Sequence, residues 1–285
     1  MDVFGDSRYR YVYPPDGDGI FQAGGIVDEG EARIPWNAKT IEDPDRVRSL
    51  RLEPSKARLR DPRLPAYVKS LRKLESLVVP TPFVPLARDL EVRTLVVGHS
   101  HEYGIPASPV SINPGVRGLM WVTSVHPPSL AQVIDPLPPL EFLHVNISGK
   151  RAVEEQLRSL TTLRHLEVVD LRNREVPVRS PLRALELGGT GRDFPFGRVV
   201  GGIGTLEALR LNGVRADIDC AVLRTLPNLV DLTVLNSKRF VDLDALLDCP
   251  KLAKVTFVNC GDPFKKQGRA RFAERGFAHL DIKFA

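Results

Sequence analysis

The chain has 285 residues, of which 42% are hydrophobic and 26% charged, a balance typical of a folded protein. No stretch approaches the roughly 20 consecutive apolar residues of a membrane-spanning helix, so we expect no membrane partner. The net charge is +5, and the three cysteines, Cys220, Cys249 and Cys260, are widely spaced. Their odd number argues against a disulfide framework and favours buried, reduced thiols in a cytoplasmic protein.

The first 45 residues differ in pattern from the rest of the chain. Three tyrosines alternate with arginine or valine over residues 8–13 (RYRYVY), which predicts a strand. Residues 14–19 (PPDGDG) are typical of a turn, and residues 20–27 are expected to return as the second strand of a hairpin. The segment lacks the apolar core of a signal peptide. We interpret 1–45 as a hairpin-like cap; the alternative is a hairpin that presents its tyrosines to a partner.

From residue 47 the chain repeats the pattern Leu-x-x-Leu-x-Leu, in which Val, Ile, Phe or Trp replaces some leucines. Eleven copies recur at steps of 18 to 27 residues. Their central residues are Leu50, Leu77, Leu95, Leu119, Leu143, Leu166, Leu185, Leu209, Leu232, Val255 and Leu280. Each copy predicts a short strand with its apolar residues on one face, and one copy alone is too thin to bury them. Stacking the copies in parallel buries them in one column, so the pattern predicts an α/β solenoid with a curved parallel sheet on its concave face.

The segments between these strands are expected to return along the convex face. Helical spacing of apolar residues predicts short helices over 152–160 and 218–226, and a shorter one over 243–247. Residues 263–275 predict a further helix, because Pro263 suits a first helical turn. A last strand over 277–284 follows it.

This pattern resembles the leucine-rich repeat family over residues 47 to 282. The resemblance implies about 10 to 11 repeats, divided into an N-terminal cap (1–45), a solenoid (46–262) and a C-terminal cap (263–285). The family places asparagine at the ninth position of each unit, and this chain departs from that. Its ninth residues are Ser55, Pro82, Ser100, Ser124, Ser148, Leu171, Thr190, Val214, Ser237 and Cys260. Most carry a hydroxyl or thiol that can bond to a turn backbone. Asparagines stand one or two positions earlier in four repeats, namely Asn146, Asn212, Asn236 and Asn259.

The concave face is the expected binding surface. The strand residues that point away from the apolar column form an apolar patch followed by a polar patch, and we expect both to project into solvent. The candidates for partner binding are Val78, Val96, Met120, Phe142, His144, His165, Glu167, Glu186, Arg210 and Asp231. Apolar anchors beside charged residues are typical of a protein-binding surface.

A glycine-rich segment, residues 188–204, interrupts the pattern. It matches no phosphate-binding motif, and we interpret it as a long flexible insert between repeats. Its phenylalanines and arginines predict an exposed contact patch formed by Arg192, Phe194, Phe196 and Arg198.

No motif indicates catalysis. The pair His99 and His101 lacks a visible third and fourth metal ligand, so we expect no metal, no cofactor and no enzyme activity. An enzyme would have to use the polar patch, where His144, His165, Glu167 and Glu186 are the candidates.

Two functions remain open. The first is a non-catalytic scaffold that binds another protein through the concave face, in one variant a bacterial inhibitor or immunity-type protein. The composition of 29 Arg and 11 Lys is compatible with a bacterial source of high GC content. The second, less favoured, is binding of nucleic acid or an anionic surface through the basic segments 46–73, with a net charge of +8, and 264–275. These segments lie at opposite ends of the predicted solenoid, and the acidic leader 1–45 is expected to pack against the first of them.

Overall fold

The computed structural model describes residues 10–12, 25–27, 31–34, 44–52, 61–98, 104–122, 129–147, 151–173, 175–176, 178–261, 264 and 266–284. The chain divides into two compact units. Unit 1 comprises residues 1–145 and 151–163, and unit 2 comprises residues 146–150 and 164–285.

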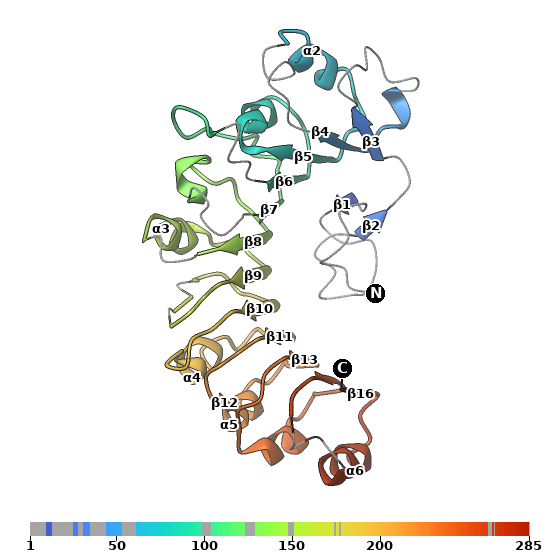
Figure 1. Ribbon diagram of the computed structural model, residues 1–285, viewed down its shortest axis with the longest axis vertical. Coiled ribbons are helices and arrows are strands. Elements are labelled where there is room, and N and C mark those ends of the chain that lie inside the picture. Colours follow the sequence, from blue (N-terminus) through green and yellow to red (C-terminus); the bar gives the residue numbers. More distant parts are fainter. Residues whose placement is uncertain are drawn as a thin grey trace. The chain divides into compact units, whose positions relative to one another are not determined.

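Unit 1 is built on a parallel sheet in which neighbours along the chain are also neighbours in space (Figure 1). Its strands are β3 (Glu31–Ile34), β4 (Ser49–Leu52), β5 (Ser76–Pro80), β6 (Thr94–Gly98), β7 (Gly118–Val122) and β8 (Phe142–Asn146). The predicted central leucines are in register from Leu50 through Leu77, Leu95 and Leu119 to Leu143. All five are fully buried, which confirms the predicted strand register in this unit.

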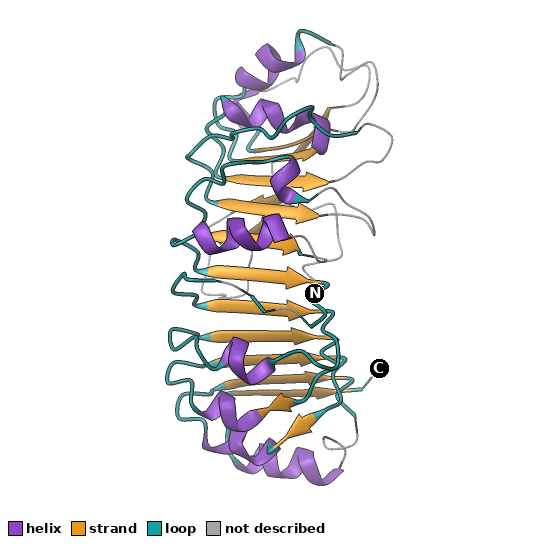
Figure 2. Ribbon diagram, turned by 90° about the vertical axis from the view of Figure 1, so that its left-hand side faces the viewer, coloured by secondary structure: helices purple, strands orange, loops and turns teal. Residues whose placement is uncertain are grey.

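Short helices cover one face of this sheet (Figure 2). They are η1 (Pro44–Arg46), α2 (Leu64–Lys69), η2 (Thr81–Arg88), η3 (Leu130–Gln132) and α3 (Arg151–Ser159). The predicted helix 152–160 is confirmed within one residue by α3, which buries Val153 and Leu157. The segment after β5 forms a 3₁₀-helix with Pro85 in its interior.

The N-terminal segment contributes both a hairpin and a sheet strand. Strand β1 (Arg10–Val12) pairs with β2 (Gly25–Val27) in antiparallel fashion, as the alternation predicts. Strand β3 pairs in parallel with β4 and so extends the sheet by one strand beyond the first repeat. Strand β1 lies against β5 and β6, on the sheet face opposite η2 (Figure 1).

Unit 2 has the same architecture. Its parallel strands are β9 (His165–Val169), β10 (Ala184–Gly188), β11 (Ala208–Asn212), β13 (Asp231–Leu235), β15 (Lys254–Val258) and β16 (His279–Lys283). The central residues are again in register, from Leu166 through Leu185, Leu209, Leu232 and Val255 to Leu280. All eleven copies of the repeat therefore form parallel strands.

The return segments of unit 2 carry α4 (Phe196–Val200), α5 (Cys220–Arg224) and η4 (Leu243–Asp248). A two-stranded parallel pair, β12 (Ile218–Asp219) and β14 (Phe240–Val241), accompanies them. The predicted helix 218–226 begins two residues late, because Asp219 caps α5 by accepting the Ala221 N–H. In the part of the chain that the structure describes, no helix is long and apolar enough to cross a membrane.

Polar side chains order the turns that follow the strands of unit 2. Asn259 donates from Nδ2 to Asn236 Oδ1 at 3.2 Å, and Asn236 donates in the same way to Asn212 Oδ1 at 3.2 Å. At the ninth positions, Thr190 Oγ1 accepts the Arg215 N–H and Ser237 Oγ accepts the Val214 N–H, each at 3.0 Å. The predicted role of the hydroxyl residues is confirmed at these two turns, where their oxygens accept hydrogen bonds from backbone N–H groups.

Aromatic residues close the C-terminal end of unit 2. Phe264 lies against Phe257, with ring centroids 4.0 Å apart, and Phe272 of α6 (Lys266–Glu274) packs on Phe257 at 5.5 Å. All three rings are buried. They cover the apolar side of the last strands, which a terminal repeat would otherwise leave exposed.

Candidate functional site

In each unit, the inner face of the sheet is the face whose side chains point away from the helices. Its side chains align across neighbouring strands as the repeat predicts. In unit 1, Val78, Val96, Met120 and His144 occupy equivalent positions on β5 to β8. In unit 2, Glu167, Glu186, Arg210 and Thr233 occupy the same positions on β9, β10, β11 and β13.

The apolar part of the inner face is buried, so the prediction that it projects into solvent is wrong. Val96, Met120 and Phe142 form one cluster with exposures of 6%, 4% and 0%, and Val78 packs at its margin. Strand β1 lies against β5 and β6 on this face and so covers part of it. The cluster is therefore a small second core of unit 1. His144, beside it, is half-buried.

The inner face of unit 2 carries a charged row formed by His165, Glu167, Glu186 and Arg210. His165 Nε2 lies 3.3 Å from Glu167 Oε1, and these two side chains are only 4% and 1% exposed. On the next strands, Arg210 Nη1 donates to Glu186 Oε2 at 3.4 Å. Glu186 stands directly opposite Glu167 in the strand register. The expectation of a fully solvated polar stripe is thus also wrong, since three of these four residues are buried.

This charged row opens toward solvent in the direction of β16. Asp231 is half-buried, whereas its register partners Lys254 and His279 are exposed. Burial raises the pKa of the Asp231 carboxyl, and the nearby Lys254 and Arg210 oppose that rise only in part. The face therefore grades from buried, paired charges at β9 and β10 to accessible polar groups at β13 to β16.

The glycine-rich segment differs from its predicted form. Phe194 and Phe196 are 4% and 3% exposed, so the expectation that they form an exposed patch is wrong. The segment folds as an ordinary return segment that contains α4, and the phenylalanines provide its buried side. Arg192 and Arg198 are exposed, and Arg198 forms an ion pair with Glu175.

Several bases of the basic segments 46–73 and 264–275 pair with neighbouring acids where the structure describes them. Arg63 donates to Asp61 at 2.7 Å and lowers the pKa of that carboxyl to about 2. Lys69 pairs with Asp89 at 2.8 Å, and Arg271 pairs with Asp244. Other bases of the first segment, including those at 56, 58 and 60, lie outside the described residues. The described pairs weaken the case for a polyanion site at either end.

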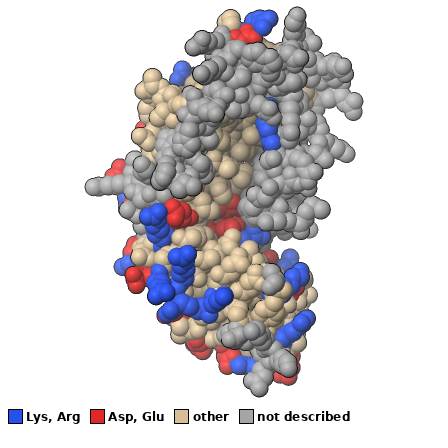
Figure 3. All heavy atoms as spheres, viewed as in Figure 1, with Lys and Arg blue, Asp and Glu red and all other residues tan. Residues whose placement is uncertain are grey.

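A different basic row lies in unit 2, on the turns that follow β9, β10, β11 and β13. It consists of the exposed residues Arg172, Arg192, Arg215 and Lys238. Lys and Arg side chains gather over this part of the molecule in Figure 3. Arg172 pairs with Asp170 at 3.4 Å. The pattern could have been found from sequence, because each base stands three or four residues after a repeat strand.

The three cysteines are buried, as predicted, and none forms a disulfide. Burial raises the pKa of the Cys220 thiol to about 12 and that of Cys249 to about 11. Burial also raises the pKa of Cys260, whose thiol donates to the Val234 carbonyl at 3.2 Å. The thiolate is the reactive form of cysteine. These thiols therefore resist chemical modification, because they are buried and because they stay protonated.

We expect an aromatic disulfide reagent at pH 8 to modify none of the three thiols in the folded protein and all three in concentrated urea. Since the folded pKa values of Cys220 and Cys249 exceed their ordinary value of 9.0, these thiols also make stability depend on pH. Their stabilising effect is complete below pH 9.0 and is lost as the pH rises toward the folded values, because only the unfolded chain ionises there. Rapid labelling of a folded thiol at pH 8 would contradict this arrangement.

Among the residues that the structure describes, no group of three or more His, Cys, Asp or Glu side chains is placed to hold a metal ion. The histidines at 99 and 101 lie outside those residues. The inner face of unit 2 thus remains the most distinctive candidate site. Compared with known proteins, the chain matches no protein-family model and no curated protein sequence.

Proposed function

We propose that the protein is a non-catalytic, leucine-rich-repeat-like solenoid that binds a partner protein through the inner face of unit 2. The parallel strands and short helices found in both units support this architecture. A sheet face held by backbone bonds is preformed, so binding to it costs little ordering entropy. One concrete form of the proposal is a cytoplasmic bacterial inhibitor or immunity-type protein, for which the arginine-rich composition is the support.

The observation that carries the proposal is the buried charged row. Removing an ionised group from water costs several kcal/mol, and apolar residues of similar size often stabilise a protein as well or better. The inner face does not need His165, Glu167, Glu186 and Arg210 to complete the leucine column on the other face of the sheet. The row places two carboxylates, Glu167 and Glu186, directly opposite each other on neighbouring strands. We infer that the partner inserts a cationic side chain, Arg or Lys, beside Glu167 and Glu186.

The test replaces Glu186 by glutamine, which keeps the size of the side chain and an acceptor oxygen but removes the charge. Loss of one member of a buried charge pair at an interface typically costs about 2–5 kcal/mol, so we expect affinity for the partner to fall by about 30-fold or more. The partner is first identified by affinity capture from host lysate with nuclease present. Its affinity for wild type and variant is then measured by calorimetry.

Glu207→Gln is the matched control, because Glu207 lies immediately before β11 and pairs with Arg183 through two hydrogen bonds of 2.7 and 2.6 Å. It removes the same charge outside the charged row and should leave the affinity unchanged. Equal binding by wild type and Glu186→Gln would exclude this face as the site. Loss of all captured material under nuclease or at high salt would instead favour polyanion binding, for which the basic row of unit 2 is the better candidate.

A further inference from the structure

A pocket of about 180 Å³ lies on the helix side of unit 2, between the segment that follows β9 and helix α4. Aliphatic side chains line its middle, and Glu175, Arg198 and Ser180 add polar groups; the aliphatic residues are Val176, Val178, Leu182, Val199 and Ile203. Leu182 is fully buried and forms part of the repeat core, whereas Val176, Val178 and Ile203 are half-exposed in the pocket. Apolar side chains of the outer layer are thus left accessible at this point.

The pocket lies between two consecutive return segments, of which the first is extended and the second carries a helix. The centres of β9 and β10 are only 19 residues apart, and the described part of the segment between them contains no helix. The next segment carries α4, followed by Gly202, which adds no side chain to the wall. The helix therefore stands beside an extended segment, and the space that a neighbouring helix would fill stays open.

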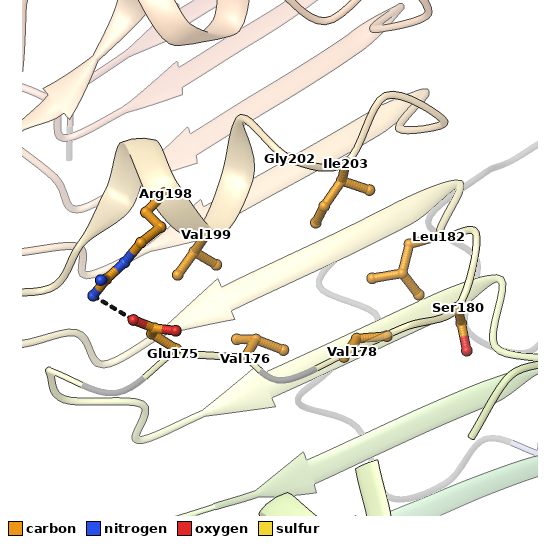
Figure 4. Close-up of a pocket in the computed structure, with 9 residues that line it drawn as sticks. All are labelled: Glu175, Val176, Val178, Ser180, Leu182, Arg198, Val199, Gly202 and Ile203. Carbon is orange, nitrogen blue, oxygen red and sulfur yellow. Dashed lines mark ion pairs between the residues drawn. The ribbon is translucent and has the colours of Figure 1, made fainter. Parts of the chain in front are cut away.

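One end of the pocket is charged. Arg198 projects from α4 toward Glu175 on the opposite segment, and the two form an ion pair across this end (Figure 4). The aliphatic side chains follow inward, and Ser180 stands at the far end. The guanidinium and the carboxylate remain 71% and 53% exposed. An exposed ion pair contributes only about 0–1 kcal/mol, so an incoming ligand can replace it with bonds of its own.

We propose that this pocket binds a free aliphatic α-amino acid, such as leucine, independently of the protein-binding face. The α-carboxylate accepts hydrogen bonds from the Arg198 guanidinium, and the α-ammonium donates to the Glu175 carboxylate. The branched side chain occupies the space between Val176, Val199 and Ile203. A zwitterion is the charge complement of an ion pair, because it offers one group of the opposite sign to each member.

Size and polarity narrow the ligand class. Sites for drug-sized molecules measure about 300–1,000 Å³, whereas an apolar cavity of about 150 Å³ holds a ring of six carbons. A pocket of about 180 Å³ therefore fits one aliphatic side chain with its head group at the mouth. Between the ion pair and Ser180 the lining side chains are aliphatic. A ligand with a charged or strongly polar side chain would lose its water there without gaining enough hydrogen-bond partners. A ligand that carries only a carboxylate or only an amine would face one like charge at the mouth.

The experiment follows the methyl signals of Val176, Val178 and Val199 by NMR during titration of the full chain with leucine, isoleucine and valine. We expect saturable shifts at these methyls with leucine. N-acetyl-leucine, which lacks the ammonium, and leucinamide, which lacks the carboxylate, are expected to bind at least 10-fold more weakly. Aspartate should produce no shift.

Two surface variants test the head-group contacts. Arg198→Gln and Glu175→Gln should each weaken leucine binding at least 10-fold while the methyl spectrum of the core stays unchanged. Arg192→Gln is the matched control, since Arg192 is exposed in the same return segment but does not line the pocket. Absence of methyl shifts at millimolar leucine would overturn the proposal. Equal binding of leucine, N-acetyl-leucine and leucinamide would also overturn it, because the pocket would then select for apolar groups alone.

Discussion

Replacement of Leu209 by aspartate is expected to prevent unit 2 from folding. Leu209 is fully buried in β11, in register with Leu185 and Leu232 on the strands to either side. Truncation of a buried leucine to alanine already costs about 2–5 kcal/mol. An unpaired carboxylate adds a desolvation cost of several kcal/mol, which brings the total near the whole stability of a typical domain, about 5–15 kcal/mol. Circular dichroism and urea unfolding of the purified variant would measure the loss.

Thr233→Asp provides the control for this variant. Thr233 lies on the neighbouring strand β13, but it is on the inner face, half-buried and opposite Arg210 in the register. A carboxylate there stays in contact with water and beside a cation, so we expect a change of less than about 1 kcal/mol. Two variants of equal stability would mean that the leucine column is not the core of unit 2.

Phe142→Asp is expected to destabilise unit 1 by at least about 3–5 kcal/mol, the usual cost of removing a buried phenylalanine side chain. Its ring is fully buried in the cluster with Val96 and Met120, although it lies on the face that the repeat pattern leaves open to solvent. Its position in the strand predicts the reverse result. There, Phe142 would be a solvent-exposed binding anchor, and its loss would leave the fold intact. Thermal and urea unfolding, followed by far-ultraviolet circular dichroism, measure the effect.

Val122→Asp separates the two outcomes. Val122 ends the adjacent strand β7 and is 47% exposed, so aspartate there should change the stability by less than about 1 kcal/mol. If Phe142→Asp were equally harmless, the inner face of unit 1 would be open in solution and its apolar residues available to a partner. A large difference between the two variants would identify the cluster as a second core.

Much of the backbone could be predicted because the repeat carries two independent signals. Alternation with a period of two identifies which residues of each strand face the core, and the constant three-residue pattern aligns the strands with one another. The register from Leu166 to Leu185 and on to Leu209 follows from these signals alone. Helix α3 and most of the C-terminal helix α6 were also predictable, since helical spacing is a local feature. Helix α6 begins at Lys266, three residues after the start that the sequence predicts.

The candidate site was predictable only in part. Its residues could be named, because the alternation places His165, Glu167 and Glu186 on the face opposite the leucines. Their burial and pairing could not be predicted, since exposure depends on what packs over a face and periodicity reports only which face a residue occupies. The same limit explains the phenylalanines at 194 and 196, which local composition marked as exposed and which the return segment buries.

The sequence by itself determined the eleven parallel strands, their register and the identity of the inner-face rows, because these depend on spacing within and between short segments. Only the tertiary structure decided that β1 packs against β5 and β6, that Phe142 is buried, and that Glu186 forms an ion pair with Arg210. The pocket at Glu175 and Arg198 belongs to the same group, since it arises where an extended segment stands beside a helix. These features are contacts between segments distant in the sequence, and packing rather than local pattern selects them.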